Sequence, residues 1–281
     1  MKKLLLILLL VGNLYAGNFE KALEAYNHQD YTTAFNLLKP LAQQGNADAQ
    51  YNLGYMYAHG LGTVQDYKQT LKWYTLAAKQ NHIDAQYNLG YMYDIGKGVK
   101  QDYKKAVKWY KLAAKQGEPD AYLKLAYLYR QGLGVKQSYK ETFKCYKFAA
   151  NKGVAEAQYN LAFMYCNGFY VKRNYKKALY WYRLAAKQNY PDAQYNIGVL
   201  YDSGQGVKKS YKKALYWYRL AAKQNYPNAQ YNIGIMYYYG QGVRQNRRKA
   251  YEWLSKAARQ GLPNAQAALE IVCGQSPWAC K

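Results

Sequence analysis

The sequence predicts an all-α solenoid built from antiparallel helix hairpins, and three observations support this fold class. A unit of 36 residues recurs along the chain, apolar residues follow helical spacing within each unit, and helix-terminus residues recur at fixed places. Self-similarity at such a period is typical of solenoids, in which each unit packs only on its neighbours. The repeat is plainest in one register of tryptophans, with Cys145 in the missing slot: Trp73, Trp109, Trp181, Trp217 and Trp253.

The first residues are typical of a secretory signal peptide. Lys2 and Lys3 give a basic start, residues 4–11 form a short apolar core, and Ala16 is a small residue before the expected cleavage site. The apolar core is too short to span a bilayer as a helix, and the alternative is a buried N-terminal helix. We expect residues 1–16 to be removed and the protein to be periplasmic or secreted, with no transmembrane segment.

The unit at residues 85–120 shows how each repeat is expected to fold. Its first part, up to Tyr93, has apolar and aromatic residues at helical spacing. Gly96 and Gly98 then interrupt the pattern where a positive φ costs little. The second part, residues 102–114, places alanine, tryptophan and tyrosine on one stripe and lysines off it. This is an amphipathic helix with a solvated basic face, so each repeat contains a helix hairpin.

Residues that mark helix ends recur in seven registers and therefore predict seven hairpins. Each second helix is preceded by an N-cap residue: Asp30, Asp66, Asp102, Ser138, Asn174, Ser210 and Asn246. Each is followed by a residue that tolerates the left-handed conformation: Gly45, Asn81, Gly117, Gly153, Asn189, Asn225 and Gly261. Proline then recurs where the next first helix begins: Pro119, Pro191, Pro227 and Pro263. Small residues inside the first helices, such as Gly90, predict a close approach to the second helices.

The repeated segments resemble the Sel1-like repeat family, which is related to tetratricopeptide repeats. The resemblance rests on AQYNLGYMY (85–93), GKGV (96–99) and DYKKAVKWY (102–110) and on their recurrence. It implies a right-handed α-solenoid with six Sel1-like repeats over residues 48–263. The first hairpin, residues 17–47, lacks the Gly-x-Gly insert and is similar to a tetratricopeptide-type cap. Residues 264–281 are expected to form a C-terminal capping helix and a cysteine-containing tail.

The resemblance also suggests where a partner binds. In related repeats the first helices line the concave face, where asparagine can hold an extended peptide backbone. The alternative is that these side chains bond within or between repeats. The predicted protein- or peptide-binding residues, with Lys124 as a point charge for a carboxylate, are Asn52, Asn88, Lys124, Asn160, Asn196 and Asn232. We therefore expect an exported, non-enzymatic scaffold or adaptor that needs no cofactor.

The strong positive charge suggests further partners. Forty lysines and arginines stand against 16 acidic residues, which gives a formal net charge of +24. Nucleic acid is the usual first interpretation of such a balance. Because export makes that partner less expected, anionic envelope components and acidic protein surfaces are the better candidates. No specific nucleic-acid partner is predicted.

Catalytic interpretations of this sequence are weak. His28, His59 and His82 have no metal-ligand spacing, so no metal site is predicted. Asp94 and Asp202 lie three repeats apart, which separates them by at least ~27 Å at ~9 Å per helical layer. They are expected to be exposed, solvated acids.

One motif, Ser210-x-x-Lys213, matches that of serine penicillin-recognising enzymes. Ser210, however, occupies the N-cap register, and a cap explains it. The alternative function is a β-lactamase-like, penicillin-binding hydrolase, because cysteine-rich Sel1-like relatives have been linked to β-lactams. This chain lacks the cysteine pair of that group. A secreted factor that binds host proteins is a further alternative.

The four cysteines have different expected roles. Cys273 and Cys280 lie close together in a tail that can turn back, and we favour a disulfide between them. Cys145 and Cys166 fall at different heights on neighbouring helices, so they are expected to be small apolar fillers. Specific function is expected at breaks in the repeat: Asp94, Lys124, Cys145, Cys166, Phe169-Tyr170 and Asp202.

Overall fold

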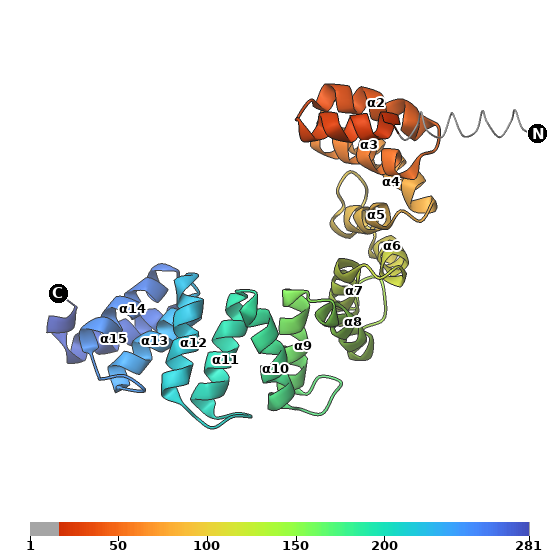
Figure 1. The fold of residues 1–281 in the computed structure, drawn as a ribbon. Coiled ribbons are helices and arrows are strands. Elements are labelled where there is room, and N and C mark those ends of the chain that lie inside the picture. Colours follow the sequence, from red (N-terminus) through yellow and green to blue (C-terminus); the bar gives the residue numbers. More distant parts are fainter. Residues whose placement is uncertain (1–16, 281) are drawn as a thin grey trace, which may run out of the picture. The chain divides into compact units, whose positions relative to one another are not determined.

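The computed structural model describes residues 17–280, and all regular elements within this range are helices (Figure 1). The predicted signal peptide lies outside the described residues. Residues 17–27 are helical, and the helices that follow are α2 (Tyr31–Gln43), α3 (Ala47–His59), α4 (Tyr67–Lys79), α5 (Ile83–Ile95), α6 (Tyr103–Lys115), α7 (Pro119–Gln131), α8 (Tyr139–Asn151), α9 (Ala155–Asn167), α10 (Tyr175–Lys187), α11 (Pro191–Ser203), α12 (Tyr211–Lys223), α13 (Pro227–Tyr239), α14 (Arg247–Arg259), α15 (Pro263–Gln275) and the short 3-10 helix η1 (Pro277–Ala279).

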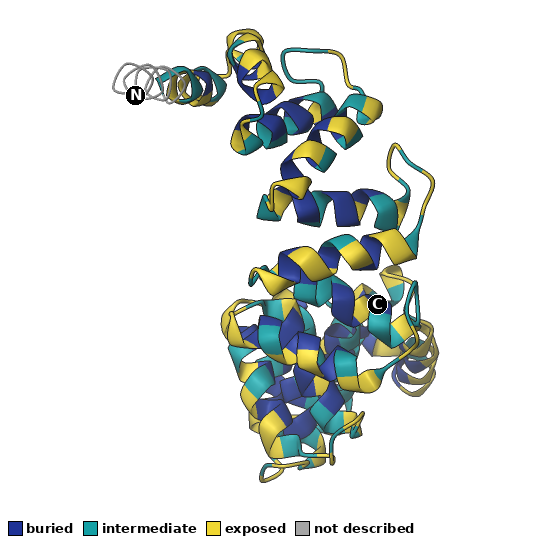
Figure 2. Ribbon diagram, turned by 90° about the vertical axis from the view of Figure 1, so that its right-hand side faces the viewer, coloured by how far each residue is buried: buried dark blue, intermediate teal, exposed yellow. Residues whose placement is uncertain are grey.

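The chain divides into two compact units, and the division falls inside α8, between Thr142 and Phe143. In the first unit, α2 to α7 pack on one another in chain order, and in the second unit α9 to α15 do the same. Figure 2 shows buried and exposed residues alternating along the helices, so that each helix is buried on one side. This is the pattern that amphipathic helices of a solenoid require, and the predicted all-α repeat fold is confirmed.

The helix ends are as the sequence predicted. Each of the seven N-cap side chains accepts a hydrogen bond from a backbone N–H in the first turn of its helix. All seven residues after the second helices have positive φ, from 59° at Asn225 to 98° at Gly45. The four repeated prolines begin α7, α11, α13 and α15. Local signals therefore set the boundaries of the hairpins.

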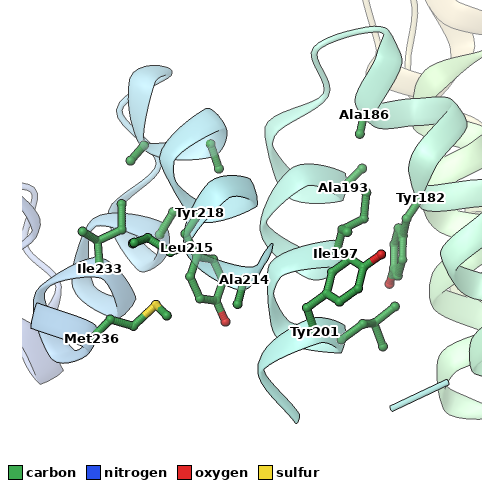
Figure 3. Close-up of a cluster of buried hydrophobic side chains, with 14 of the residues drawn as sticks. Tyr182, Ala186, Ala193, Ile197, Tyr201, Ala214, Leu215, Tyr218, Ile233 and Met236 are labelled. Atoms are coloured by element: carbon green, nitrogen blue, oxygen red, sulfur yellow. The ribbon is translucent and has the colours of Figure 1, made fainter. Parts of the chain in front are cut away.

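Small residues in the first helices allow the close contact that the sequence suggested. A Cβ atom on Gly90 would lie 2.6 Å from the ring of Tyr110, and one on Gly198 would lie 2.5 Å from the ring of Tyr218. Figure 3 shows Tyr218 among the buried side chains of the second unit. Tyr182 and Tyr218 are each 1% exposed, and Ile197 and Ile233 beside them are fully buried. Tyrosine rings thus occupy the volume that the glycines leave free.

A ladder of glutamines, which the sequence analysis did not anticipate, joins consecutive repeats. The buried Gln86 amide donates to the carbonyl of Ala78 at the end of the preceding helix, over 3.1 Å. Its oxygen accepts from Gln116 at 2.8 Å, thirty residues further on. The same side-chain pair recurs in both units: Gln50 with Gln80, Gln158 with Gln188, Gln194 with Gln224, and Gln230 with Gln260. The Ala78 carbonyl also accepts from the backbone N–H of Asn81 at 3.1 Å, so what the ladder chiefly satisfies is the buried glutamine amide itself.

The third repeat interrupts this ladder. Its two glutamine positions hold Tyr122 and Lys152, so both members of the pair change together. The division between the two units falls in the same repeat.

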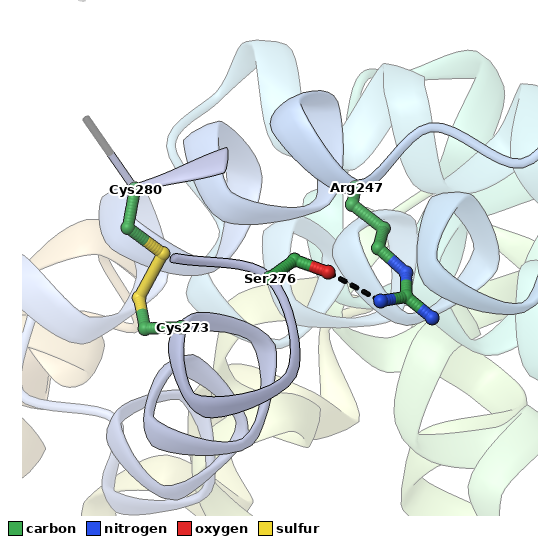
Figure 4. The surroundings of a disulfide bond; sticks show 4 residues. All are labelled: Arg247, Cys273, Ser276 and Cys280. Atoms are coloured by element: carbon green, nitrogen blue, oxygen red, sulfur yellow. Dashed lines mark hydrogen bonds between the residues drawn. A yellow bond between two sulfur atoms is a disulfide. The ribbon is translucent and has the colours of Figure 1, made fainter. Parts of the chain in front are cut away.

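The C-terminal segment packs on the last hairpin of the second unit. Helix α15 packs on α14, and Cys273 and Cys280 form a disulfide whose Cα atoms are 5.7 Å apart (Figure 4). This is the pair that the sequence favoured. Cys145 and Cys166 are not bridged to each other. No helix in the described part of the chain is long and apolar enough to cross a bilayer.

Candidate binding site

A pocket of about 250 Å³ lies between the first two complete repeats, within the first unit. Helix α3 contributes Tyr55 and Ala58, α4 contributes Tyr74, and α5 contributes Asn88 and Tyr91. Lys97, from the loop after α5, completes one side. The pocket therefore combines aromatic surface, an amide and a cation, which is a lining suited to a protein side chain or peptide segment.

A second pocket, of about 310 Å³, lies in the second unit between α9, α10 and α11. All nine of its lining residues lie 108 positions, or three repeats, after a residue that lines the first pocket. Phe163 takes the place of Tyr55, Cys166 that of Ala58, and Asn196 that of Asn88. The repeat architecture thus builds the same kind of pocket twice, with different side chains at its wall.

The residue at one first-helix position, next to the buried tyrosine of the second helix, determines how much space each repeat leaves for a pocket. Asp94 accepts a hydrogen bond from the Tyr110 hydroxyl at 3.2 Å, and Asp202 accepts one from the Tyr218 hydroxyl at 3.3 Å. Both carboxylates are half-buried. The prediction that they are exposed, solvated acids is therefore wrong, because each is the partner of a buried phenol. At the same register the first pocket has Ala58, whose short side chain leaves space next to Tyr74.

Burial sets the protonation states around these sites. It raises the pKa of the Tyr74 and Tyr182 hydroxyls well above the usual value, so both remain neutral donors. Burial also raises the pKa of the Cys166 thiol, and a hydrogen bond with Tyr182 only partly offsets this rise. A protonated thiol is a poor nucleophile. The second pocket is therefore chemically suited to binding rather than to covalent chemistry.

The predicted asparagine ladder is half-buried along its whole length. Asn52, Asn160 and Asn196 donate to the carbonyl four residues earlier in their own helices, at 2.8–2.9 Å. Asn88 bonds to the hydroxyls of Tyr51 and Tyr74, which lowers the pKa of both against the larger effect of burial. Asn232 stands in the same relation to Tyr195 and Tyr218. Hydrogen bonds within and between repeats thus occupy these amides, and the pockets bring Asn88 and Asn196 to their walls.

Lys124 lies beside the first unit's aromatic surface. Its ammonium is 5.7 Å from the centre of the Tyr91 ring, which is 38% exposed. Its charge also lowers the pKa of Asp94, although burial raises that pKa overall. Arg130 lies over Tyr127 in the same way, with 5.9 Å between the guanidinium carbon and the ring centre. The first helices of this unit therefore present exposed rings next to cations. The peptide-binding role of the ladder stays a prediction.

Other suspected residues have structural partners. The Ser210 hydroxyl accepts from the backbone N–H of Lys213 at 3.4 Å, as expected for an N-cap. His82 caps α5 through Nδ1, and its Nε2 lies 3.3 Å from an Asp48 oxygen. The His59 ring packs against Tyr55, with 4.1 Å between centroids. Within residues 17–280, no group of three or more His, Cys, Asp and Glu side chains is arranged to hold a metal ion.

These features define a repeat scaffold of helix hairpins with side-chain-sized pockets between its repeats. The chain belongs to the Sel1 repeat family, whose pattern matches residues 29–46 and then six complete units: 47–82, 83–118, 119–154, 155–190, 191–226 and 227–262. The first match is half a unit and lies in the hairpin that we expected to be a tetratricopeptide-type cap.

Two solved structures support this assignment. The chain is 36% identical to a protective antigen with an SLR fold from uropathogenic Escherichia coli strains, with a TM-score of 0.82 over 86% of this chain. It spans only 52% of that protein's length. It is 34% identical to a Sel1 repeat protein from Oxalobacter formigenes, with a TM-score of 0.73, covering 86% of this chain and 99% of that one. No curated protein sequence matches the chain.

Proposed function

We propose that the protein is an exported, non-enzymatic adaptor that binds a peptide segment of another protein. The binding sites are the pocket around Tyr55 and Asn88 and the pocket around Phe163 and Asn196, which we call the first-helix pockets. The observation that carries this proposal is the recurrence of one pocket in both units, lined in each case by an asparagine of the predicted ladder. Sel1 repeat proteins bind other proteins, and each pocket has the size and lining to hold one side chain of a peptide segment.

The surroundings of the pockets support a peptide ligand. In the first pocket, Tyr55 and Tyr91 offer aromatic contact area at low entropic cost, and Lys97 offers a charge for a carboxylate. In the second pocket, Phe163, Val199 and Gln205 replace them, so this pocket has no cation and suits an uncharged side chain. Burial keeps the tyrosine at the base of each pocket neutral, so it presents no charge to a ligand.

Three further observations support the non-enzymatic and exported parts of the proposal. The Ser210 hydroxyl is occupied as a helix cap, and burial keeps the Cys166 thiol protonated, so neither residue is an activated nucleophile. The Cys273–Cys280 disulfide fits an oxidising compartment. N-terminal sequencing of the protein from envelope or culture medium should begin near Gly17. Recovery of the intact leader from the cytoplasm would count against export.

The decisive experiment fills each pocket with a residue that a sister repeat already carries. Tyr238 occupies the register of Ala58 and Cys166 beside Leu254, where the two pocket repeats have Tyr74 and Tyr182, so the folding of each variant must be checked. Peptides would first be selected on the wild-type protein from a displayed random library. Ala58→Tyr and Cys166→Tyr should then weaken the selected peptides by tenfold or more, about 1.4 kcal/mol, measured by fluorescence anisotropy.

The control variants remove exposed tyrosine rings from second helices, at positions that do not line either pocket. Tyr180 and Tyr216, both 58% exposed, lie on the second helices α10 and α12. Tyr180→Ala with Tyr216→Ala should leave peptide affinity within twofold. Unchanged binding in both filled-pocket variants, with normal circular dichroism and melting temperature, would rule out the pockets as the binding site.

A further inference from the structure

A third cavity, of about 920 Å³, lies at the C-terminal end of the second unit and is distinct from the repeated pockets. Four cations line it: Arg244, Arg247, Arg248 and Lys249. Its other notable side chain is Trp278, which is 65% exposed. No carboxylate lines this cavity among residues 17–280. We call it the arginine–tryptophan pocket.

Hydrogen bonds from Arg247 and the disulfide hold the C-terminal tail against the pocket. The Arg247 guanidinium donates to the backbone oxygen of Gln275 at 3.3 Å and to the hydroxyl of Ser276 (Figure 4). Ser276 is only 1% exposed, and Arg247 is half-buried beside it. The Cys273–Cys280 disulfide closes the loop that carries Trp278. Arg247 therefore positions the tail, and the disulfide restricts where the tryptophan can lie.

The remaining cations face solvent. Arg244, Arg248 and Lys249 are exposed, and the two ion pairs found in the described part of the chain lie elsewhere. The Lys249 ammonium lies 5.6 Å from the centre of the Tyr237 ring, which orients it beside the cavity. The start of α14 adds its partial positive charge to the same place. An anionic ligand here would meet attraction from several sides and no opposing carboxylate.

We propose that the arginine–tryptophan pocket binds an acidic segment of a partner protein, with a carboxylate on Arg244 or Arg248 and an apolar side chain against Trp278. Arginine binds carboxylates in a bidentate geometry, and tryptophan and arginine are the residues that most often dominate protein interfaces. A single exposed ring is less suited to single-stranded nucleic acid, which stacks successive bases on several rings. The pocket is additional to the first-helix pockets of the proposed function and does not depend on them.

The disulfide makes this binding sensitive to the redox state. Residues 273–280 form a short loop, and its reduction releases the constraint on Trp278. The aromatic contact should then weaken while the cations of α14 stay in place. Binding of an acidic segment is therefore strongest in the oxidised protein.

The test uses a labelled peptide of four glutamates around one phenylalanine, with fluorescence anisotropy at constant ionic strength. Arg244→Gln with Arg248→Gln should weaken binding by tenfold or more. The control, Lys208→Gln with Lys212→Gln, removes the same charge from the equivalent exposed positions one repeat earlier, and it should change affinity by less than threefold. Trp278→Ala and reduction with a phosphine should each weaken binding severalfold, and reduction should have no further effect on Trp278→Ala.

Three outcomes would overturn the proposal. Equal losses in the arginine and lysine variants would mean that only the overall charge attracts the peptide. Tighter binding of an oligothymidine of similar length would assign the pocket to nucleic acid. Unchanged binding in Trp278→Ala would exclude the tail from the site. Asn88→Ala with Asn196→Ala should leave this peptide unaffected, so failure here is distinguishable from failure of the proposed function.

Discussion

The two first-helix pockets share one frame but differ in what they offer a ligand. In both, a second-helix tyrosine forms the base, and an asparagine from the next repeat forms one wall. The first pocket has alanine at the register beside the tyrosine, whereas the second has Cys166, whose thiol bonds to the Tyr182 hydroxyl. The wall changes from Tyr91 and Lys97 in the first to valine and glutamine in the second.

This difference shows which residues build the scaffold and which ones vary. Caps, small residues and buried tyrosines repeat because every hairpin needs the same ends and the same close packing. Positions at the pocket wall have no such requirement, since side chains of several sizes fit there. The register of Ala58 accommodates Asp94, Arg130, Cys166 and Tyr238 in other repeats. Specificity can therefore change in one pocket without a change in the fold.

Because the helix contacts are built alike in the two units, overpacking them should lower the free energy of unfolding by large and equal amounts. Gly90→Leu and Gly198→Leu both place atoms where tyrosine rings already lie, at 2.6 Å and 2.5 Å from the new Cβ. Each substitution should lower the free energy of unfolding by up to about 3 kcal/mol. Denaturant unfolding followed by circular dichroism measures this loss. A clear loss in one variant and none in the other would show that the two helix contacts are not equivalent.

The glutamine ladder offers a second, smaller comparison. Gln86→Ala removes a buried amide together with its bonds to the Ala78 carbonyl and to Gln116, so it should cost about 1–2 kcal/mol. Gln116→Ala removes the exposed partner in the same pair and should cost less than about 1 kcal/mol, because water can replace it. Chemical denaturation of both variants measures the difference. A larger loss of stability in the Gln116 variant than in the Gln86 variant would contradict the expectation that the buried amide contributes more.

The sequence predicted the scaffold well because helix ends obey local rules. Ser210 illustrates this, since comparison with sister repeats identified it as a cap, and its hydroxyl accepts the expected bond. The pockets could not be predicted in the same way, because they depend on how three helices meet around Tyr74 or Tyr182. Asp94 was misassigned for a related reason: its partner, Tyr110, lies on the neighbouring helix. The glutamine ladder was visible as a recurrence, but only the packing shows that Gln50 and Gln86 are buried.

The smallest expected effect concerns pH and contrasts two acids of one repeat. Burial raises the pKa of Asp94 above its usual value of 3.8, whereas a backbone hydrogen bond from Lys105 lowers that of Asp102. A raised folded-state pKa means that the stability contribution of Asp94 is present below pH 3.8 and is lost as pH rises through the raised pKa. For Asp102 the contribution is present above the unfolded-state pKa and is lost as pH falls through the lowered one.

The corresponding asparagine variants should therefore have opposite pH trends. Relative to wild type, Asp94→Asn should gain stability as pH rises from about 3.5 towards about 7, by a few tenths of a kcal/mol because the half-exposed carboxylate is screened by solvent. The amide oxygen that this substitution introduces can still accept from Tyr110. Asp102→Asn, which keeps a capping side chain, should lose stability over the same range. Denaturant midpoints measured across this pH series give both trends. Parallel slopes would mean that the burial of Asp94 and the cap at Asp102 do not control their titration.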